Sequence, residues 1–68
     1  MSTSIYKVVE LTGTSPKSWE EAVKNVVQRA SKSLRDLRIV EVEKLDAKIE
    51  DGKVVAFRAK VKLSFKFE

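Results

Sequence analysis

Cysteine and histidine are both absent from this chain of 68 residues. Without cysteine the chain can form no disulfide and no thiolate metal site. Without histidine it lacks the commonest general base and the commonest protein ligand of transition metals. No nucleophile–base pair or carboxylate dyad is visible either, so the sequence does not predict an enzyme. A catalytic site shared between subunits stays open.

Long apolar runs are also absent. No stretch is long and apolar enough to cross a membrane. Met1–Ser4 contains no basic segment followed by an apolar run, so we expect no signal peptide and a cytoplasmic location. The 14 basic and 10 acidic residues give a formal net charge of +4 and are interspersed along the chain. Interspersed charges favour a solvated surface over a nucleic-acid-binding patch.

The short length predicts a single domain over residues 1–68. A domain of this size buries only about 60% of the surface that its unfolded chain exposes, so its core is marginal. Small domains usually compensate with a disulfide, a metal or self-association. Because disulfides are excluded here, we expect a homo-oligomer, in which oxygen ligands could also hold a hard cation.

The first half of the chain predicts a strand followed by a helix. Isoleucine, tyrosine and valine over Ile5–Leu11 predict the strand, and glycine and proline in residues 12–16 predict a loop. Ser18 and Glu21 form a capping box at the start of the helix, which we expect to end near Arg35. The helix carries an apolar stripe at helical spacing: Trp19, Ala22, Val23, Val26, Val27, Ala30 and Leu34.

The second half is typical of a β-hairpin. Asp51-Gly52 favours a two-residue turn, because both central positions need positive φ. The turn joins predicted strands at Arg38–Ile49 and Lys53–Glu68 and fixes their register. In this register apolar residues face each other on one side (Val42 and Val61, Val40 and Leu63), and opposite charges on the other (Glu43 and Lys60, Glu41 and Lys62).

This register has one flaw, since it leaves Lys44 and Asp46 on the apolar side. We therefore expect a β-bulge near them. The last strand, with 16 residues, would extend about 50 Å, and the helix covers only about half of that length. Leu63, Phe65 and Phe67 stay exposed on the uncovered apolar face, which predicts an association surface.

The order of elements, β-α-β-β, and several local segments resemble the dodecin family. Residues 6–18, 50–54 and 61–68 resemble its opening, its hairpin and its closing strand, and Thr12-Gly13-Thr14-Ser15 is the most specific of the matching segments. The resemblance covers nearly the whole chain. It implies an α+β fold in which a three-stranded antiparallel sheet wraps around one helix. It also implies a hollow homododecameric shell that stores or buffers flavin, as riboflavin or FMN, without catalysis.

Two positions depart from the flavin-binding pattern. The resemblance implies a tryptophan that stacks on the flavin ring, and the matching residue here is Ile39. It also implies a glutamine that bonds the polar edge of the ring, and the matching residue is Arg58. Isoleucine offers no π-face, and arginine has no acceptor for the ring N–H. We therefore expect weak or absent flavin binding.

Another branch of the family, calcium dodecin, lacks that tryptophan. The helix start, Ser15-Pro16 followed by Ser18-Trp19-Glu20, and Arg38 before a β-branched residue resemble this branch. The resemblance implies a calcium-associated shell, and flavin storage stays open as the alternative.

Calcium takes six to eight oxygen ligands, and no segment of this chain could supply them alone. In a shell, a carboxylate that lies near a three-fold axis is repeated in three subunits, so three carboxylates would surround the axis. Our first candidate is Asp46, which the ideal register places awkwardly on the apolar side, and our second is Glu20 in the first helical turn. Asp46 could instead lie in a solvated bulge, and Glu20 could simply favour the helix N-terminus.

Two further residues have alternative roles. Trp19 is in phase with the apolar stripe, so we expect packing rather than a ligand contact. Arg58 could bind an anion or pair with a carboxylate of a neighbouring subunit, and the ion pair is favoured. A nucleic-acid-binding sheet is disfavoured, because the phenylalanines of the last strand lie opposite its basic side chains.

Overall fold

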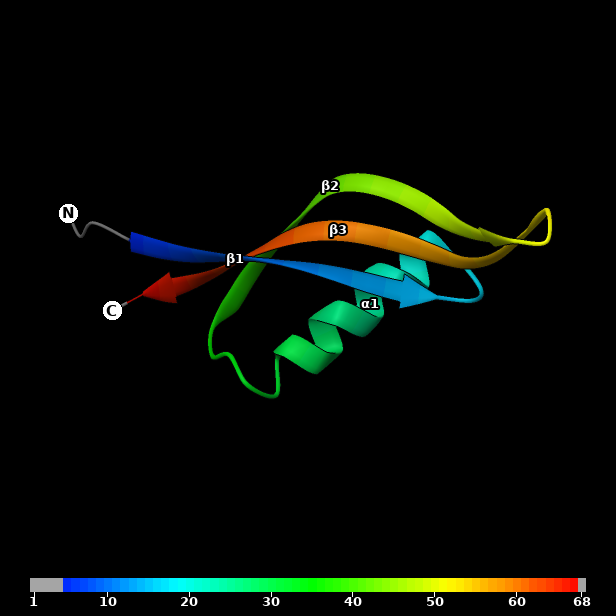
Figure 1. Ribbon diagram of the computed structural model, residues 1–68. Coiled ribbons are helices and arrows are strands. Elements are labelled where there is room, and N and C mark those ends of the chain that lie inside the picture. Colours follow the sequence, from blue (N-terminus) through cyan, green and yellow to red (C-terminus); the bar gives the residue numbers. More distant parts are fainter. Residues whose placement is uncertain (1–4, 68) are drawn as a thin grey trace.

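The computed structural model describes residues 5–67 and has the predicted α+β order of elements (Figure 1). The expectation about a signal peptide concerns residues 1–4, which lie outside the described residues. Strand order in the sheet is β1-β3-β2, and both neighbouring pairs are antiparallel. One helix lies across one face of this sheet. The elements are β1 (Ile5–Ser15), α1 (Trp19–Ala30), β2 (Leu37–Glu50) and β3 (Lys53–Phe67).

Strand β1 runs four residues beyond its predicted end, through most of the segment that we predicted as a loop. That prediction was wrong because it took Gly13 for a turn residue. Gly13 instead pairs with Ala59 inside the sheet. A Cβ at Gly13 would collide with the carbonyl oxygen of Ala22 and lie 3.0 Å from the Cβ of Val26. Gly13 therefore lets the helix approach the strand closely.

The start of α1 confirms half of the predicted capping box. Ser18 Oγ accepts a hydrogen bond from Glu21 N at 3.0 Å. The Glu21 carboxylate does not return this bond to Ser18, since it accepts from Ser15 Oγ at 3.0 Å. Ser15 Oγ also accepts from the backbone N–H groups of Lys17 and Ser18, at 3.0 and 3.5 Å. Buried Ser15 thus fixes the entry into the helix.

The helix ends at Ala30, five residues before the predicted end. The chain continues in single turns, because the N–H groups of Ser33 and Leu34 both donate to Ala30 O, at 3.0 and 2.8 Å. Asp36 then adopts a left-handed conformation with φ of 59° and leads into β2. Serine side chains compete for backbone hydrogen bonds, and Ser31 Oγ donates to the Gln28 backbone oxygen at 2.8 Å, which is consistent with the early end.

The hairpin has the predicted turn, with φ of 53° at Asp51 and 74° at Gly52. The predicted pairs of Val42 with Val61, Val40 with Leu63 and Glu41 with Lys62 are also confirmed. The predicted bulge exists, and it consists of register shifts between Val42 and Lys44 and between Lys48 and Ile49. A third shift lies between Leu37 and Ile39.

The bulge corrects one predicted pair. Glu43 is the extra residue, so Lys44 rather than Glu43 faces Lys60. The Glu43 carboxylate lies 3.0 Å from Lys62 Nζ instead. Between the two shifts the register moves by one residue, which pairs Leu45 with Ala59 and turns the charged neighbours of Leu45 to the other face.

The core is small and lies between α1 and the middle of the sheet. Of the described residues, the buried apolar ones are Ala22, Val26, Ala30, Ala59, Val61 and Leu63. They belong to the predicted helical stripe and to the predicted apolar face of β3. The prediction that Leu63 stays exposed was wrong, because Leu63 is buried in the same core cluster as the helix residues. Phe65 is half-buried, and the Phe67 side chain lies outside the described side chains.

The strands extend beyond both ends of the helix (Figure 1). The molecule measures 55 × 21 × 14 Å, and its radius of gyration is 14.1 Å. A compact chain of this length has a radius of gyration of about 11 Å. None of the helices in the described part of the chain is long and apolar enough to span a membrane.

Candidate functional site

Arg58 and Asp46 form a bidentate ion pair between β3 and β2. Arg58 Nε donates to Asp46 Oδ1 at 2.7 Å, and Nη2 donates to Oδ2 at 2.8 Å. Both side chains are about half exposed. The hydrogen bond from Arg58 lowers the pKa of the Asp46 carboxyl, and the same bond raises the pKa of Arg58. Arg58 therefore forms the ion pair that we expected, but with a carboxylate of its own chain.

Trp19 connects the start of the helix to this ion pair. Its Nε1 donates to the backbone oxygen of Asp46 at 2.9 Å. Its ring packs edge-to-face on Phe57, with centroids 4.9 Å apart and planes at 71°. These contacts are those of a packing residue, although 40% of Trp19 remains exposed.

Ile39 lies far from Arg58 in the same sheet. It pairs with Ser64, whereas Arg58 lies six residues earlier on β3, which is about 20 Å along the strand. Ile39 is 59% exposed and borders an apolar hollow of 110 Å³ between the start of β2 and the helix. The fold does not bring the two positions of the flavin pattern together within one chain.

Glu20 lies in the first turn of α1 and is exposed to solvent. It has no ion pair among the described residues, and its negative charge favours the helix N-terminus. Nowhere in residues 5–67 do three acidic side chains gather as a metal site would require. The carboxylate oxygens of Asp46 are already engaged by Arg58. Within residues 5–67 of one chain, no cluster of acidic side chains therefore offers the six to eight oxygen ligands of calcium.

Sequence reasoning missed the role of Lys44. The bulge places it directly opposite Lys60, and like charges in this position repel. Nearby lysines have carboxylate partners, Glu10 for Lys60 at 3.6 Å and Glu43 for Lys62 at 3.0 Å. The hydrogen bond from Lys62 lowers the pKa of Glu43, with a further contribution from Glu10. The register shifts before Lys44 and after Lys48 determine which residue faces Lys60. Counting the residues between these two shifts could have revealed the position of Lys44.

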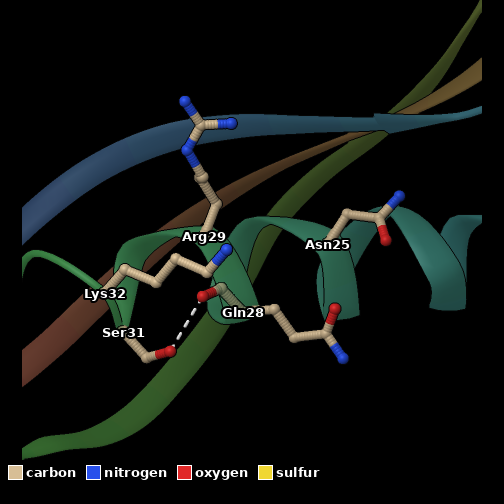
Figure 2. A pocket seen from close by; sticks show the side chains of 5 residues that line it. All are labelled: Asn25, Gln28, Arg29, Ser31 and Lys32. Carbon is tan, nitrogen blue, oxygen red and sulfur yellow. Dashed lines mark hydrogen bonds between the residues drawn. The ribbon is translucent and has the colours of Figure 1, made fainter.

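An open hollow of 530 Å³ lies on the exposed face of α1 and the turn after it. Figure 2 shows the five residues that line it: Asn25, Gln28, Arg29, Ser31 and Lys32. The side chain of Arg29 is directed away from the other four. Ser31 Oγ donates to the Gln28 backbone oxygen at 2.8 Å. Cations at the end of a helix stabilise its dipole, so this hollow has the features of an ordinary helix surface.

A second groove is apolar and lies between β1 and α1. It measures 430 Å³, and its walls include Val9, Leu11, Val26, Ala30 and Leu34. Leu11, one of these lining residues, is 38% exposed. An apolar groove of this kind is open to a further side chain from outside the monomer.

Comparison with known proteins identifies the family. The sequence matches the dodecin family over residues 5–68. The chain belongs to the dodecin family. This confirms the family resemblance found in the segments 6–18, 50–54 and 61–68 of the sequence.

Two curated dodecins are similar over nearly the whole chain. The calcium dodecin of Mycobacterium tuberculosis is 41% identical over 63 residues, which cover 93% of this chain and 89% of the relative. The dodecin of Thermus thermophilus is 34% identical over 64 residues, which cover 94% of this chain and 93% of the relative.

Solved dodecin structures have the same fold. The dodecin of Streptomyces coelicolor superposes with a TM-score of 0.94 at 44% identity and covers 100% of this chain and 97% of its own. The structure of the M. tuberculosis protein superposes with a TM-score of 0.84 at 42% identity, covering 96% and 93%. That protein is described as calcium-chelating, with a novel calcium-binding site.

Proposed function

We propose that this dodecin is a non-enzymatic subunit of a hollow homododecameric shell that associates with calcium and binds flavin weakly or not at all. The proposal depends on one observation: Ile39 and Arg58 stand where the flavin-binding pattern has a tryptophan and a glutamine. A single domain and a cytoplasmic location belong to the same proposal.

The excess surface of the monomer supports self-association. Its solvent-accessible area is 5447 Å², whereas a compact monomer of this mass exposes about 4,300 Å². The excess, about 1,100 Å², is comparable with the roughly 800 Å² that each partner buries in a standard interface. Large apolar side chains are exposed on all three strands: Ile5, Tyr6, Val8, Leu11, Ile39, Val40, Val42, Leu45, Ile49, Val54 and Val55.

The chemistry of Ile39 and Arg58 supports weak flavin binding. Ring stacking on an aromatic side chain contributes about 1–3 kcal/mol, so its loss at Ile39 should weaken binding by roughly ten- to a hundredfold. Arg58 donates hydrogen bonds but cannot accept one from the flavin ring. Its guanidinium is also held by Asp46.

Similarity to calcium dodecin supports the calcium part of the proposal. Since no cage fits within one chain, the ion would have to be shared between copies, so that one carboxylate is repeated by symmetry. Glu20 is the stronger candidate, because its carboxylate is exposed and has no ion pair among the described residues. Asp46 would first have to leave Arg58.

Flavin storage is the alternative function. The apolar hollow of 110 Å³ beside the exposed Ile39 supports it, because a flavin ring could make apolar contact there. A shell could also bring Ile39 of one copy near Arg58 of another.

A riboflavin titration separates the two functions. We expect no quenching of riboflavin fluorescence at micromolar protein, and equilibrium dialysis of chelator-treated protein should show calcium uptake. Strong quenching would establish the flavin alternative. A shell that takes up no calcium would remove the calcium part and leave the assembly proposal intact.

A further inference from the structure

The net charge of the chain is located on one surface. Residues 22–35, which cover most of α1 and the turns after it, contain four basic residues and no acidic one. Of the 14 basic and 10 acidic residues of the chain, the remaining positions therefore contain ten of each. The formal net charge of +4 comes entirely from this segment. We call its basic residues the helix-face cations: Lys24, Arg29, Lys32 and Arg35.

The helix-face cations are exposed and unpaired. All four lie at exposed positions, and none of them forms an ion pair within residues 5–67. The four ion pairs of this part of the chain all join side chains of the strands. The positive charge of the helix face is therefore not neutralised by the chain itself.

The helix dipole does not account for the whole set. Its effect falls off within the last turn of a helix, so it favours a cation such as Arg29. Lys24 lies well before the end of α1 at Ala30, whereas Lys32 and Arg35 lie beyond it. The segment thus extends its positive charge further than the stability of the helix requires.

The hollow of 530 Å³ on this face has the side chains of a phosphate-binding surface (Figure 2). Two of the helix-face cations, Arg29 and Lys32, line it together with asparagine, glutamine and serine. Proteins contact the phosphates of nucleic acids with these residue types. None of the lining residues is aromatic, so the hollow lacks the rings on which single-stranded bases stack. These features fit the backbone of a duplex.

Exposed apolar side chains lie elsewhere. Among the described residues, the large ones belong to the strands, except for Trp19 at the start of α1. The strands therefore carry the surfaces suited to contacts with other copies, and the helix face is suited to a charged partner. A membrane-surface helix inserts its apolar face into the lipid, but the apolar residues of α1 pack on the sheet. This favours nucleic acid over a membrane.

We propose that the helix-face cations bind the phosphate backbone of double-stranded nucleic acid without sequence preference. The binding energy comes from neutralised phosphates and the release of their counterions. This surface is not the sheet face that the sequence disfavours for nucleic acid. In the proposed homododecamer the face is repeated in every subunit, so several copies could contact one duplex and raise the affinity. Only this gain rests on the proposed function.

Fluorescence anisotropy of a labelled DNA duplex, with the full-length protein, tests the proposal. We expect the affinity to fall at least roughly a hundredfold between about 50 and 200 mM salt, as contacts with four phosphates imply. An AT-rich and a GC-rich duplex should bind equally, because contacts with the backbone carry no sequence information.

Arg29→Gln combined with Lys32→Gln removes both cations from the hollow. At about 100 mM salt this variant should bind at least about tenfold more weakly, and the slope of log K against log salt should decrease by about two. The matched control is Lys17→Gln with Lys53→Gln. It lowers the net charge equally, at exposed positions outside the helix face that have no ion pair within residues 5–67. The control should keep the wild-type affinity.

Three results would overturn the proposal. Equal weakening by the control would mean that net charge alone attracts the duplex. A wild-type protein that does not bind at about 50 mM salt would remove the site. Binding to phosphatidylserine vesicles but not to DNA would assign the face to a membrane. Native mass spectrometry tests the shell separately: a monomer whose DNA binding still depended on Arg29 and Lys32 would remove the homododecamer and keep this proposal.

Discussion

Of the two glycines, Gly13 is the one whose neighbours leave no room for a side chain. The helix backbone at Ala22 lies where a Cβ would stand, and backbone cannot move aside as a flexible side chain can. Gly52 is the opposite case, because nothing lies within 4 Å of its Cβ position and only its φ of 74° restricts substitution. The chain thus contains one glycine for packing and one for a turn.

We predict that Gly13→Ala destabilises the protein by about 3 kcal/mol, at the upper end of the range for overpacking, or by more. Gly52→Ala should cost about 1–2 kcal/mol, from the left-handed backbone alone. Urea unfolding of both variants at one protein concentration measures the difference. Equal losses would mean that the helix can shift away from β1.

The positions of the flavin pattern allow a gain-of-function prediction. Ile39→Trp combined with Arg58→Gln should strengthen riboflavin binding by about tenfold or more, because stacking on an aromatic ring contributes about 1–3 kcal/mol. Fluorescence quenching measures the affinity, and Ile39→Phe with Arg58→Gln is a graded control. If the affinity for riboflavin were unchanged, residues other than these two would determine whether the protein binds flavin.

Two carboxylates make the stability of the fold depend on pH in the acid range. Hydrogen bonds from Arg58 and Lys62 lower the pKa values of Asp46 and Glu43 below their usual 3.8 and 4.5. A depressed folded-state pKa stabilises the fold above the unfolded pKa, and this stabilisation is lost as pH falls through the folded value. Urea midpoints should therefore decrease from about pH 5 to pH 3. Asp46→Asn should make this decrease shallower, and a parallel decrease in both proteins would contradict the assignment.

At the scale of the elements, β2 determines where the charged residues lie. Two of its three register shifts enclose Lys44–Lys48, and the pairing between them turns Asp46 toward Arg58. Because Glu43 is the extra residue, removing it would join Val42 to Lys44 in one continuous register. Each of the other residues would keep its partner and its face.

We predict that deletion of Glu43 is tolerated and lowers the urea midpoint only slightly, because it removes a bulge and one solvent-exposed pair with Lys62. Deletion of Leu45 is the matched control, since it forces Lys44 or Asp46 onto the apolar face and should prevent folding. Circular dichroism and urea unfolding distinguish the two variants. If both deletions were equally harmful, the register between the bulges would not be the determining feature.

The sequence was sufficient for the elements that depend on local patterns. Alternation in the last strand, the helical stripe and Asp51-Gly52 predicted the strand, the helix and the hairpin, and the misplaced Lys44 and Asp46 predicted a bulge. The arrangement of the three strands around the helix came from the family resemblance. It was insufficient where tertiary contacts decide. Gly13 and Ser15 gave loop signals, but the helix packed above them makes them strand residues. The pair of Asp46 with Arg58 could not be predicted either, because it depends on where the bulge begins and ends.

At the scale of the whole molecule, the monomer has too little core for its surface. Six buried apolar residues hold the described part of the chain together, while the strands extend beyond the helix at both ends (Figure 1). The groove between β1 and α1 and the exposed apolar residues of β2 offer surfaces to other copies. Stability gained from such contacts rises with protein concentration.

The central claim is that this dodecin works as a calcium-associated homododecamer. Native mass spectrometry of the protein, before and after treatment with a chelator, tests it most directly. We predict a species of about 92 kDa, twelve times the 7.7 kDa of one chain, with bound calcium that the chelator removes and without flavin. A monomer at 7.7 kDa, or a shell that carries flavin and no calcium, would contradict the account.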